Sequence, residues 1–315
     1  MASYGGIDLG GTKIQTVVVD DERTVLGSSR RPTPTSGGPA DVAEAIAAAL
    51  GDAAATAGVE TSALAGVGVG SPGTIEGGEV TSARNLPGWE GSFPLAETLE
   101  RSFGTHVALG NDVQLATDAE FRLGAGRAYE SLLGVFWGTG VGGGLVLAGK
   151  PWLGRGAAGE IGHVVVELGG ARCTCGRRGC MEAYAGRAAM EAHAKKELEK
   201  GRRTNLFTLM KERDRTRLTS GIWARALEQQ DELATHLIER ALNALGAGVA
   251  SVVNVLDVES VIVGGGLGVR LGEPYAKRIA EAMQPHLFAD FRPPAVQVAA
   301  LGDLGGAIGA TLLVE

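Results

Sequence analysis

The three cysteines of the chain all lie in one short stretch, Cys173-Thr-Cys175-Gly-Arg-Arg-Gly-Cys180, and His163 precedes them. Three thiolates and one neutral imidazole nitrogen are the ligand set of a closed, tetrahedral zinc site. We therefore predict that His163, Cys173, Cys175 and Cys180 bind a structural Zn²⁺. Such a site requires the chain around it to fold back so that four side chains meet at one point.

Other interpretations of the cysteines remain open. They could form one disulfide and leave a free thiol, or pack as small buried residues, but an odd number so closely spaced favours a metal. A nucleic-acid-binding zinc ribbon would use Arg172, Arg177 and Arg178. The chain, however, has 29 basic and 36 acidic residues and a net charge of −7, so we expect no nucleic-acid partner.

Two acidic residues flank the predicted metal ligands. Glu160 precedes His163 in Glu160-Ile-Gly-His163, and Glu182 follows Cys180. A purely structural zinc site does not need these carboxylates, so we expect a polar ligand to bind beside the metal loop. Taken singly, Glu160 could be a surface acid and His163 a buried histidine of the core.

Length and composition indicate a two-domain globular protein. At 315 residues the chain is long for a single hydrophobic core. Its 50 glycines are about twice the average usage, and many lie in short turns between apolar runs. No run of about 18 apolar residues occurs, and Asp8 interrupts the N-terminus before a signal sequence could develop. We expect a cytoplasmic protein with no membrane contact.

Predicted strands alternate with predicted helices, which indicates an α/β fold. A hairpin of strands at Tyr4–Leu9 and Gln15–Asp20 resembles a second one at Leu132–Trp137 and Leu145–Ala148, so two similar halves are expected.

Two predictions concern the chain beyond the cysteines. We predict one continuous helix over Met181–Lys200 and a charged, solvated insertion over Lys195–Arg217.

Three glycine turns follow predicted strands: Asp8-Leu-Gly-Gly-Thr-Lys13, Gly138-Thr-Gly-Val-Gly-Gly-Gly144 and Gly264-Gly-Gly266. The second matches G-x-G-x-x-G, but it leads into a strand, whereas a dinucleotide-binding turn must open a helix. A Walker A sequence is absent. A single glycine turn is more often only a turn, but together these suggest that phosphates are held between two hairpins.

Three further motifs accompany these turns: Gly110-Asn-Asp112, Glu160-Ile-Gly-His163 and Cys173-x-Cys175-Gly-x₂-Gly-Cys180-x-Glu182. Together the motifs resemble those of the ROK sugar kinases, and within that family they most resemble those of bacterial glucokinases. The resemblance covers essentially the whole chain in the family's order. It implies two RNase H-like domains of the actin-like/hexokinase ATPase superfamily, with a cleft between them. We expect residues 1–117 and 301–315 to form one domain and residues 118–300 the other.

The resemblance also implies site residues. Asp112 would be the catalytic carboxylate near the sugar hydroxyl, although an Asp after a strand is also a common helix N-cap. The other residues expected to contact the sugar are Asn85, Asn111, Glu160, His163 and Glu182. Asn85 could equally serve a turn.

Nucleotide contacts are implied in the same way. Asp8 would hold Mg²⁺ through water, and Lys13 could reach a phosphate or only extend along the surface. The phosphates and adenosine of ATP would contact Gly10, Gly11, Thr12, Thr139, Gly140, Gly265 and Gly266.

The expected reaction is ATP-dependent phosphorylation of a hexose, with D-glucose favoured. Mannose, fructose, N-acetylmannosamine or N-acetylglucosamine could replace glucose, and polyphosphate could replace ATP. A sugar-responsive regulator is the other alternative, but only seven residues precede Asp8, so we expect no DNA-binding domain. The family tendency is a homodimer or homotetramer.

Overall fold

The computed structural model describes residues 2–83 and 85–315 and divides the chain into two compact units. The first unit runs up to Arg127 and also includes Pro151–Ala158 and Ala300–Glu315, and the second comprises Ala128–Lys150 and Gly159–Ala299. The first segment of this unit therefore ends at Arg127, later in the sequence than the predicted end at residue 117. The reason is that helix α3 (Asp112–Leu123) packs against helix α11 (Gly305–Thr311) inside the first unit.

The first unit contains a five-stranded sheet in the order β3-β2-β1-β4-β7. The first three strands form an antiparallel meander, and β4 and β7 run parallel to β1. The bounds are β1 Tyr4–Leu9, β2 Lys13–Val19, β3 Val25–Pro32, β4 Gly66–Ser71 and β7 Val107–Asn111, with a small hairpin of β5 Thr74–Glu76 and β6 Glu79–Thr81.

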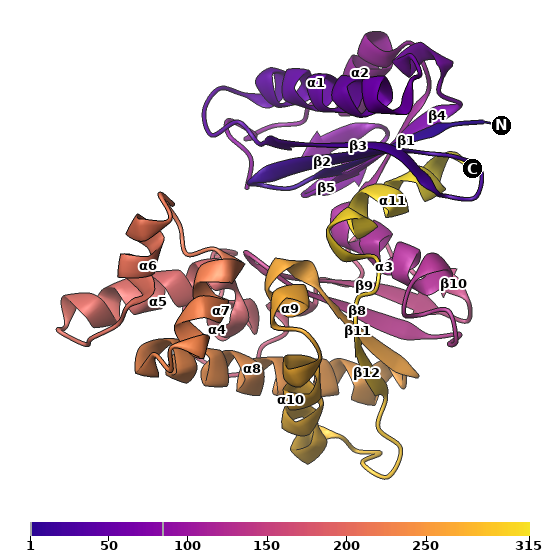
Figure 1. Cartoon of the computed structure of the whole chain (residues 1–315). Helices are drawn as coiled ribbons and strands as arrows, with labels where there is room; N and C mark the ends of the chain where they lie inside the picture. Colours follow the sequence, from indigo (N-terminus) through magenta and orange to yellow (C-terminus); the bar gives the residue numbers. More distant parts are fainter. Residues whose placement is uncertain (1, 84) are drawn as a thin grey trace. The chain divides into compact units, whose positions relative to one another are not determined.

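Helices cover both faces of this sheet (Figure 1). Helices α1 (Pro39–Ala57) and α2 (Leu95–Phe103) contribute to the larger apolar core, which includes Ile14 and Val18 of β2. Val17 and Val19, on either side of Val18, point to the opposite face and pack with α11, as the two-residue period of a strand requires.

Two glycines of the sheet allow α11 to pack directly on the strands. A Cβ atom on Gly6 would overlap the carbonyl oxygen of Ala307, and one on Gly68 would overlap that of Ala310. Part of the high glycine content therefore serves close packing between a helix and the sheet, in addition to turns.

The second unit repeats the strand order of the first as β10-β9-β8-β11-β12. Strands β8 (Leu132–Trp137) and β9 (Val141–Leu147) form an antiparallel hairpin, whereas β11 (Ser260–Gly264) is parallel to β8 and to β12 (Ala295–Val298). Strand β10 is Lys150–Pro151. The expectation of two similar α/β halves is confirmed.

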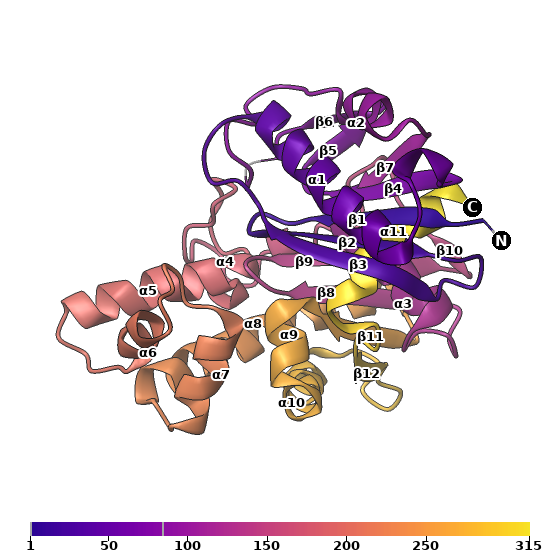
Figure 2. The same cartoon turned by 45° about the horizontal axis from the view of Figure 1, so that its top comes forward.

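The helices of the second unit lie mainly between β10 and β11 in sequence (Figure 2). They are α4 Glu182–Ala185, α5 Arg187–Glu199, α6 Leu206–Glu212, α7 Ser220–Glu228, α8 Glu232–Leu256, α9 Gly265–Leu271 and α10 Glu273–Met283. Short 3₁₀ turns in this unit are η2 Ile161–His163 and η3 Gln284–His286, and those in the first unit are η1 Thr61–Ala63, η4 Gly302–Leu304 and η5 Leu312–Val314.

Two sequence predictions in this unit need correction. The helix predicted over Met181–Lys200 is broken at Gly186, whose extended backbone (φ −59°, ψ 131°) separates α4 from α5. The segment Lys195–Arg217 is not wholly solvated, because it contains α6, in which Leu206 and Leu209 are buried.

None of the helices in the described part of the chain combines the length and the apolar composition that a membrane crossing requires.

Candidate active site

In the first unit, three parallel strands bring the predicted polar residues to one edge of the sheet. The carboxyl ends of β1, β4 and β7 lie side by side, with Asp8 paired to Gly70 and Asn111 paired to Ser71. Asp112 follows directly as the first residue of α3. Sheets of this kind bind ligands at this edge.

The first glycine turn is held by backbone and side-chain hydrogen bonds. The amide of Gly10 donates to the carbonyl of Lys13 (2.9 Å), and the hydroxyl of Thr33 donates to the carbonyl of Gly10 (2.6 Å). Gly11 lies against Asn85, whose carbonyl oxygen would be 3.0 Å from a Cβ atom at Gly11. The predicted residue Asn85 therefore borders the predicted phosphate turn.

Asp8 is partly buried next to this turn. Its pKa is raised to about 6, mainly by burial and to a smaller extent by the Asp303 carboxylate, while the nearby Lys13 acts in the opposite direction. The Lys13 ammonium lies 3.7 Å from the Asp303 carboxylate. Helix α11 also approaches Asp8, since a Cβ atom at Gly306 would lie 2.9 Å from its carboxyl carbon. A carboxylate in this setting favours a bound cation.

Asn111 and Asp112 form the beginning of α3. Asn111 is the N-cap, because its side-chain oxygen accepts from the amides of Val113 (3.1 Å) and Gln114 (3.0 Å). The alternative prediction that Asp112 is the N-cap is therefore wrong, since Asn111 holds that position. The Asp112 carboxylate accepts from the Val113 amide (2.9 Å).

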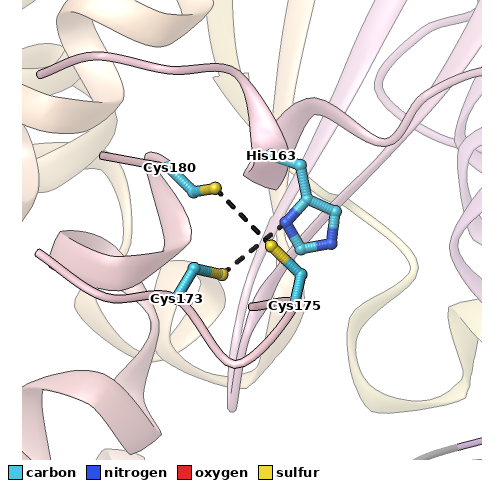
Figure 3. Close-up of side chains that lie close together, drawn as sticks. All are labelled: His163, Cys173, Cys175 and Cys180. Atoms are coloured by element: carbon cyan, nitrogen blue, oxygen red, sulfur yellow. Dashed lines mark hydrogen bonds between the residues drawn. The ribbon is translucent and has the colours of Figure 1, made fainter. Parts of the chain in front are cut away.

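In the second unit, the four predicted zinc ligands converge (Figure 3). Their ligand atoms all lie within 4.8 Å of one another. The sulfur atoms of Cys175 and Cys180 are 3.7 Å apart, and the Cys173 sulfur is 3.8 Å from Nδ1 of His163. A tetrahedron with metal–ligand bonds of about 2.0–2.3 Å has edges of about 3.3–3.8 Å. The cluster is thus a candidate Zn²⁺ site.

The three thiols differ in how readily they lose a proton in the absence of a metal. Burial raises the pKa of Cys173 to about 12 in the metal-free protein. For Cys175 burial acts in the same direction, but the Arg177 backbone and the other two thiols outweigh it and lower its pKa to about 7. A thiolate is the form that binds metal.

Neighbouring residues hold the metal loop in place. His163 ends the turn η2, which packs on β9 where Gly143 leaves room for the side chain of Ile161. Met181 is fully buried against Gly248 of α8. The hydroxyl of Tyr184 donates to the carboxylate of Glu167 and accepts from the Ala171 amide.

The hydrogen bonds by which Tyr184 and Glu167 hold the metal loop were not predicted from the sequence. The only signal was their position on either side of the cysteines, which does not distinguish them from other polar residues.

Glu182 connects the metal loop to the second glycine turn. One carboxylate oxygen accepts from the amide of Val141 (3.0 Å), and a Cβ atom at Gly140 would overlap that oxygen. The other oxygen accepts from the hydroxyl of Thr174 (3.3 Å) and lies 3.7 Å from the Cys173 sulfur. Glu160 is more exposed and lies 3.7 Å from Nε2 of His163.

The second and third glycine turns are adjacent. The observed turn between β8 and β9 is only Gly138–Gly140, because Val141–Gly144 of the predicted turn belong to β9, and Thr139 at its tip is exposed. Gly265 has a positive φ of 77°, and a Cβ atom there would lie 2.7 Å from the backbone of Trp137. Gly265 and Gly266 therefore begin α9 beside the end of β8. The predicted nucleotide residues of this unit lie together.

Comparison with known proteins shows the family to which the chain is similar. Residues 4–315 match the ROK family. The chain is 31% identical over 320 residues to the glucokinase of Thermotoga maritima, covering 98% of this chain and 96% of that protein. It is 32% identical over 328 residues to the N-acetyl-D-glucosamine kinase of Citrobacter koseri, covering 98% of each.

A solved structure is similar to this chain over almost its whole length. The ROK family glucokinase of Streptomyces griseus, in complex with glucose and AMPPNP, has a TM-score of 0.84 and 31% sequence identity, with 99% of both chains covered. The fold is thus that of the sugar kinases of the actin-like ATPase fold. This chain belongs to the ROK family.

Proposed function

We propose that this protein transfers the γ-phosphoryl group of ATP to the 6-hydroxyl of a hexose and that D-glucose is its preferred substrate. The observation that carries the proposal is the position of Glu182. Its carboxylate contacts both the loop of the candidate zinc site and the second glycine turn, so the proposed sugar-binding and phosphate-binding parts of the second unit are directly joined.

In the second unit, we assign the sugar hydroxyls to Glu160, His163 and Glu182. His163 directs Nδ1 at the cysteines, which leaves Nε2, beside Glu160, for a hydroxyl group. Zn²⁺, when bound, fixes the loop that carries these residues. Because the chain itself supplies four ligands, no position is left for an activated water.

In the first unit, we assign Asp112 to the reacting hydroxyl and Asn111 and Asn85 to sugar contacts. Asp112 accepts the hydroxyl proton as the bond from the sugar oxygen to phosphorus forms and the bond from phosphorus to the ADP oxygen breaks. A loose transition state requires only late removal of the proton, so an ordinary carboxylate is sufficient.

The phosphates would contact the turn formed by Gly10, Gly11 and Thr12 in the first unit and the turn Thr139–Gly140 in the second. Asp8 would hold Mg²⁺ through water, and the ion would neutralise charge on the phosphates. Lys13, which lies near enough to influence the pKa of Asp8, adds positive charge at the same edge.

The choice of glucose rests on desolvation. Each buried polar group left unpaired by a wrong hydroxyl costs about 1–3 kcal/mol, and two such losses give roughly hundredfold discrimination. Relatives at the same level of identity include glucokinases and an N-acetyl-D-glucosamine kinase, so the group at the sugar 2-position is the main point to test.

The test is a measurement of kcat/KM with ATP and Mg²⁺ for glucose, mannose, fructose, N-acetylglucosamine and N-acetylmannosamine under identical conditions. We expect the highest value for glucose. A higher value for any other sugar would overturn the glucose assignment and leave the kinase assignment intact. Replacing ATP by polyphosphate in the same assay identifies the phosphoryl donor.

A further inference from the structure

Arg187 occupies the point where the second glycine turn meets the broken helix. It is the first residue of α5, immediately after the break at Gly186. Its backbone amide donates to the carbonyl of Gly138 (3.1 Å), and the Ala188 amide donates to that of Thr139 (3.0 Å). These amides are therefore already bonded to the turn, so the cationic group that α5 offers here is the Arg187 side chain.

The guanidinium of Arg187 donates to two hydroxyl groups. One nitrogen is 2.9 Å from Oγ1 of Thr139, and the other is 2.8 Å from Oγ of Ser220, the first residue of α7. A guanidinium has no acceptor, so both hydroxyl oxygens must accept. Their own protons then point elsewhere, which makes Thr139 and Ser220 hydrogen-bond donors toward a third group.

The guanidinium charge of Arg187 is available to an anion as that third group, because it is not neutralised by a direct ion pair with a described residue. No carboxylate in the described part of the chain forms an ion pair with Arg187 or with Arg217. Burial lowers the pKa of Arg187, and Arg217 lowers it further, against the attraction of Glu191. The Glu191 carboxylate accepts from the Leu218 amide (3.0 Å).

The third glycine turn reaches the same place. A Cβ atom on Gly266 would lie 3.4 Å from Oγ of Ser220, and one on Gly138 would lie 3.9 Å from the Gly266 amide nitrogen. Two glycine turns and the start of α7 therefore meet around the Arg187 guanidinium, in the part of the second unit assigned to the nucleotide.

We propose that Arg187 is a positioning residue for the phosphate chain of the nucleotide, because it fixes the Thr139 and Ser220 hydroxyls as donors and adds beside them a positive charge that has no ion-pair partner in the described part of the chain. This inference rests on the proposed kinase function and adds a residue to its nucleotide site. Lysine cannot replace it fully, since an ammonium lacks the planar fork that reaches two oxygens at once.

The experiment compares wild type with Arg187→Gln, Arg187→Lys, Thr139→Val and the Arg187→Gln/Thr139→Val double variant. We expect Arg187→Gln to raise KM for ATP about tenfold, a loss typical of one charge-assisted hydrogen bond, with KM for glucose within about twofold. The KM of Arg187→Lys for ATP should lie between those of wild type and Arg187→Gln. The double variant should be little worse than Arg187→Gln alone, because the contribution of the Thr139 hydroxyl depends on Arg187.

Arg225→Gln is the matched control. Arg225 lies on α7 but is paired with Glu228 at the surface (2.9 Å), so its removal should change neither KM. A KM for ATP that is unchanged in Arg187→Gln overturns the inference. Equal increases in KM for ATP and for glucose also overturn it, since they indicate a general structural role.

Two further measurements keep the inference separate from the proposed function. If wild type phosphorylates no sugar, the proposed function fails, and calorimetric binding of ADP then tests Arg187 alone. About tenfold weaker ADP binding by Arg187→Gln supports the inference, and unchanged binding contradicts it. If Arg187→Gln does not fold, Arg187→Lys and Thr139→Val decide: both must weaken ATP or ADP binding selectively, and normal binding by both contradicts the inference.

Discussion

Asp112 combines two properties that a catalytic carboxylate needs. It begins α3 at the edge of the sheet that also carries Asp8, and its hydrogen bond from the Val113 amide fixes its orientation. Because Asn111 satisfies the helix N-terminus, the carboxylate of Asp112 can be changed without removing the cap. Its chemical role and its structural role are therefore experimentally separable.

Asp112→Asn should lower kcat at least about 10²-fold while leaving glucose affinity largely unchanged, because it removes the proton acceptor and keeps the shape. Steady-state kinetics and calorimetric glucose binding measure the two effects. Glu44→Gln, an exposed change on α1, is the control. Near-normal turnover in Asp112→Asn would assign the base to another residue, and loss of folding would assign Asp112 a structural role.

Asp8 should make the stability of the magnesium-free protein depend on pH. Burial raises the pKa of Asp8 from 3.8 to about 6. Between these values the folded protein retains a proton that the unfolded chain has lost, so the contribution of Asp8 to the free energy of unfolding falls as pH rises. The expected fall is on the order of 2–3 kcal/mol.

Denaturant unfolding of wild type, Asp8→Asn and the exposed control Asp290→Asn between pH 4 and about 7 measures this effect. Asp8→Asn should lose that part of the pH dependence, whereas Asp290→Asn should retain it. The same slope in Asp8→Asn and wild type would show that another group titrates.

The metal loop shows how far a sequence pattern can predict an element. The spacing of His163, Cys173, Cys175 and Cys180 predicted the cluster, because ligand chemistry requires those side chains to meet. The break at Gly186 was not predictable in the same way. A glycine within an alanine-rich run is compatible with a continuous helix, and only the tertiary bonds of α5 to Gly138 and Thr139 reveal the break.

Cys175→Ser should release zinc and loosen the loop that carries Glu182. Metal analysis of protein purified without chelators measures the zinc content, with Arg172→Gln as a control in the same loop. We expect one zinc per chain in wild type and in the control. Less than about half an equivalent in wild type, or full activity of a zinc-free Cys175→Ser variant, would rule out the structural zinc.

Glu120 of α3 joins two segments of the first unit. Its buried carboxylate accepts from the amides of Ala125 (3.0 Å), Ala300 (2.9 Å) and Leu301 (2.8 Å). Glu120→Ala leaves these amides without their partner and should lower the free energy of unfolding by about 2–4 kcal/mol. Denaturant unfolding measures the change, and a loss below about 1 kcal/mol would mean that water replaces the carboxylate.

For the whole chain, alternating hydrophobic segments and repeated glycine turns were enough to predict two similar α/β halves, because each hairpin has a two-residue period. The less regular parts of the chain were harder to predict from the sequence. Helix α9 begins at Gly265 within a run of three glycines that indicated only a turn, and the charge of the 195–217 segment obscured the buried pair Leu206 and Leu209 in α6.

In the proposed reaction, residues of both units take part in one phosphoryl transfer from ATP to a sugar. The most direct measurement is the amount of ADP and of glucose 6-phosphate formed by purified wild type from ATP, Mg²⁺ and glucose, quantified in the same reaction. We predict equal amounts of the two products and negligible ADP formation when glucose is omitted. ADP formation that does not depend on sugar, or no transfer to any hexose of the panel, would contradict the account.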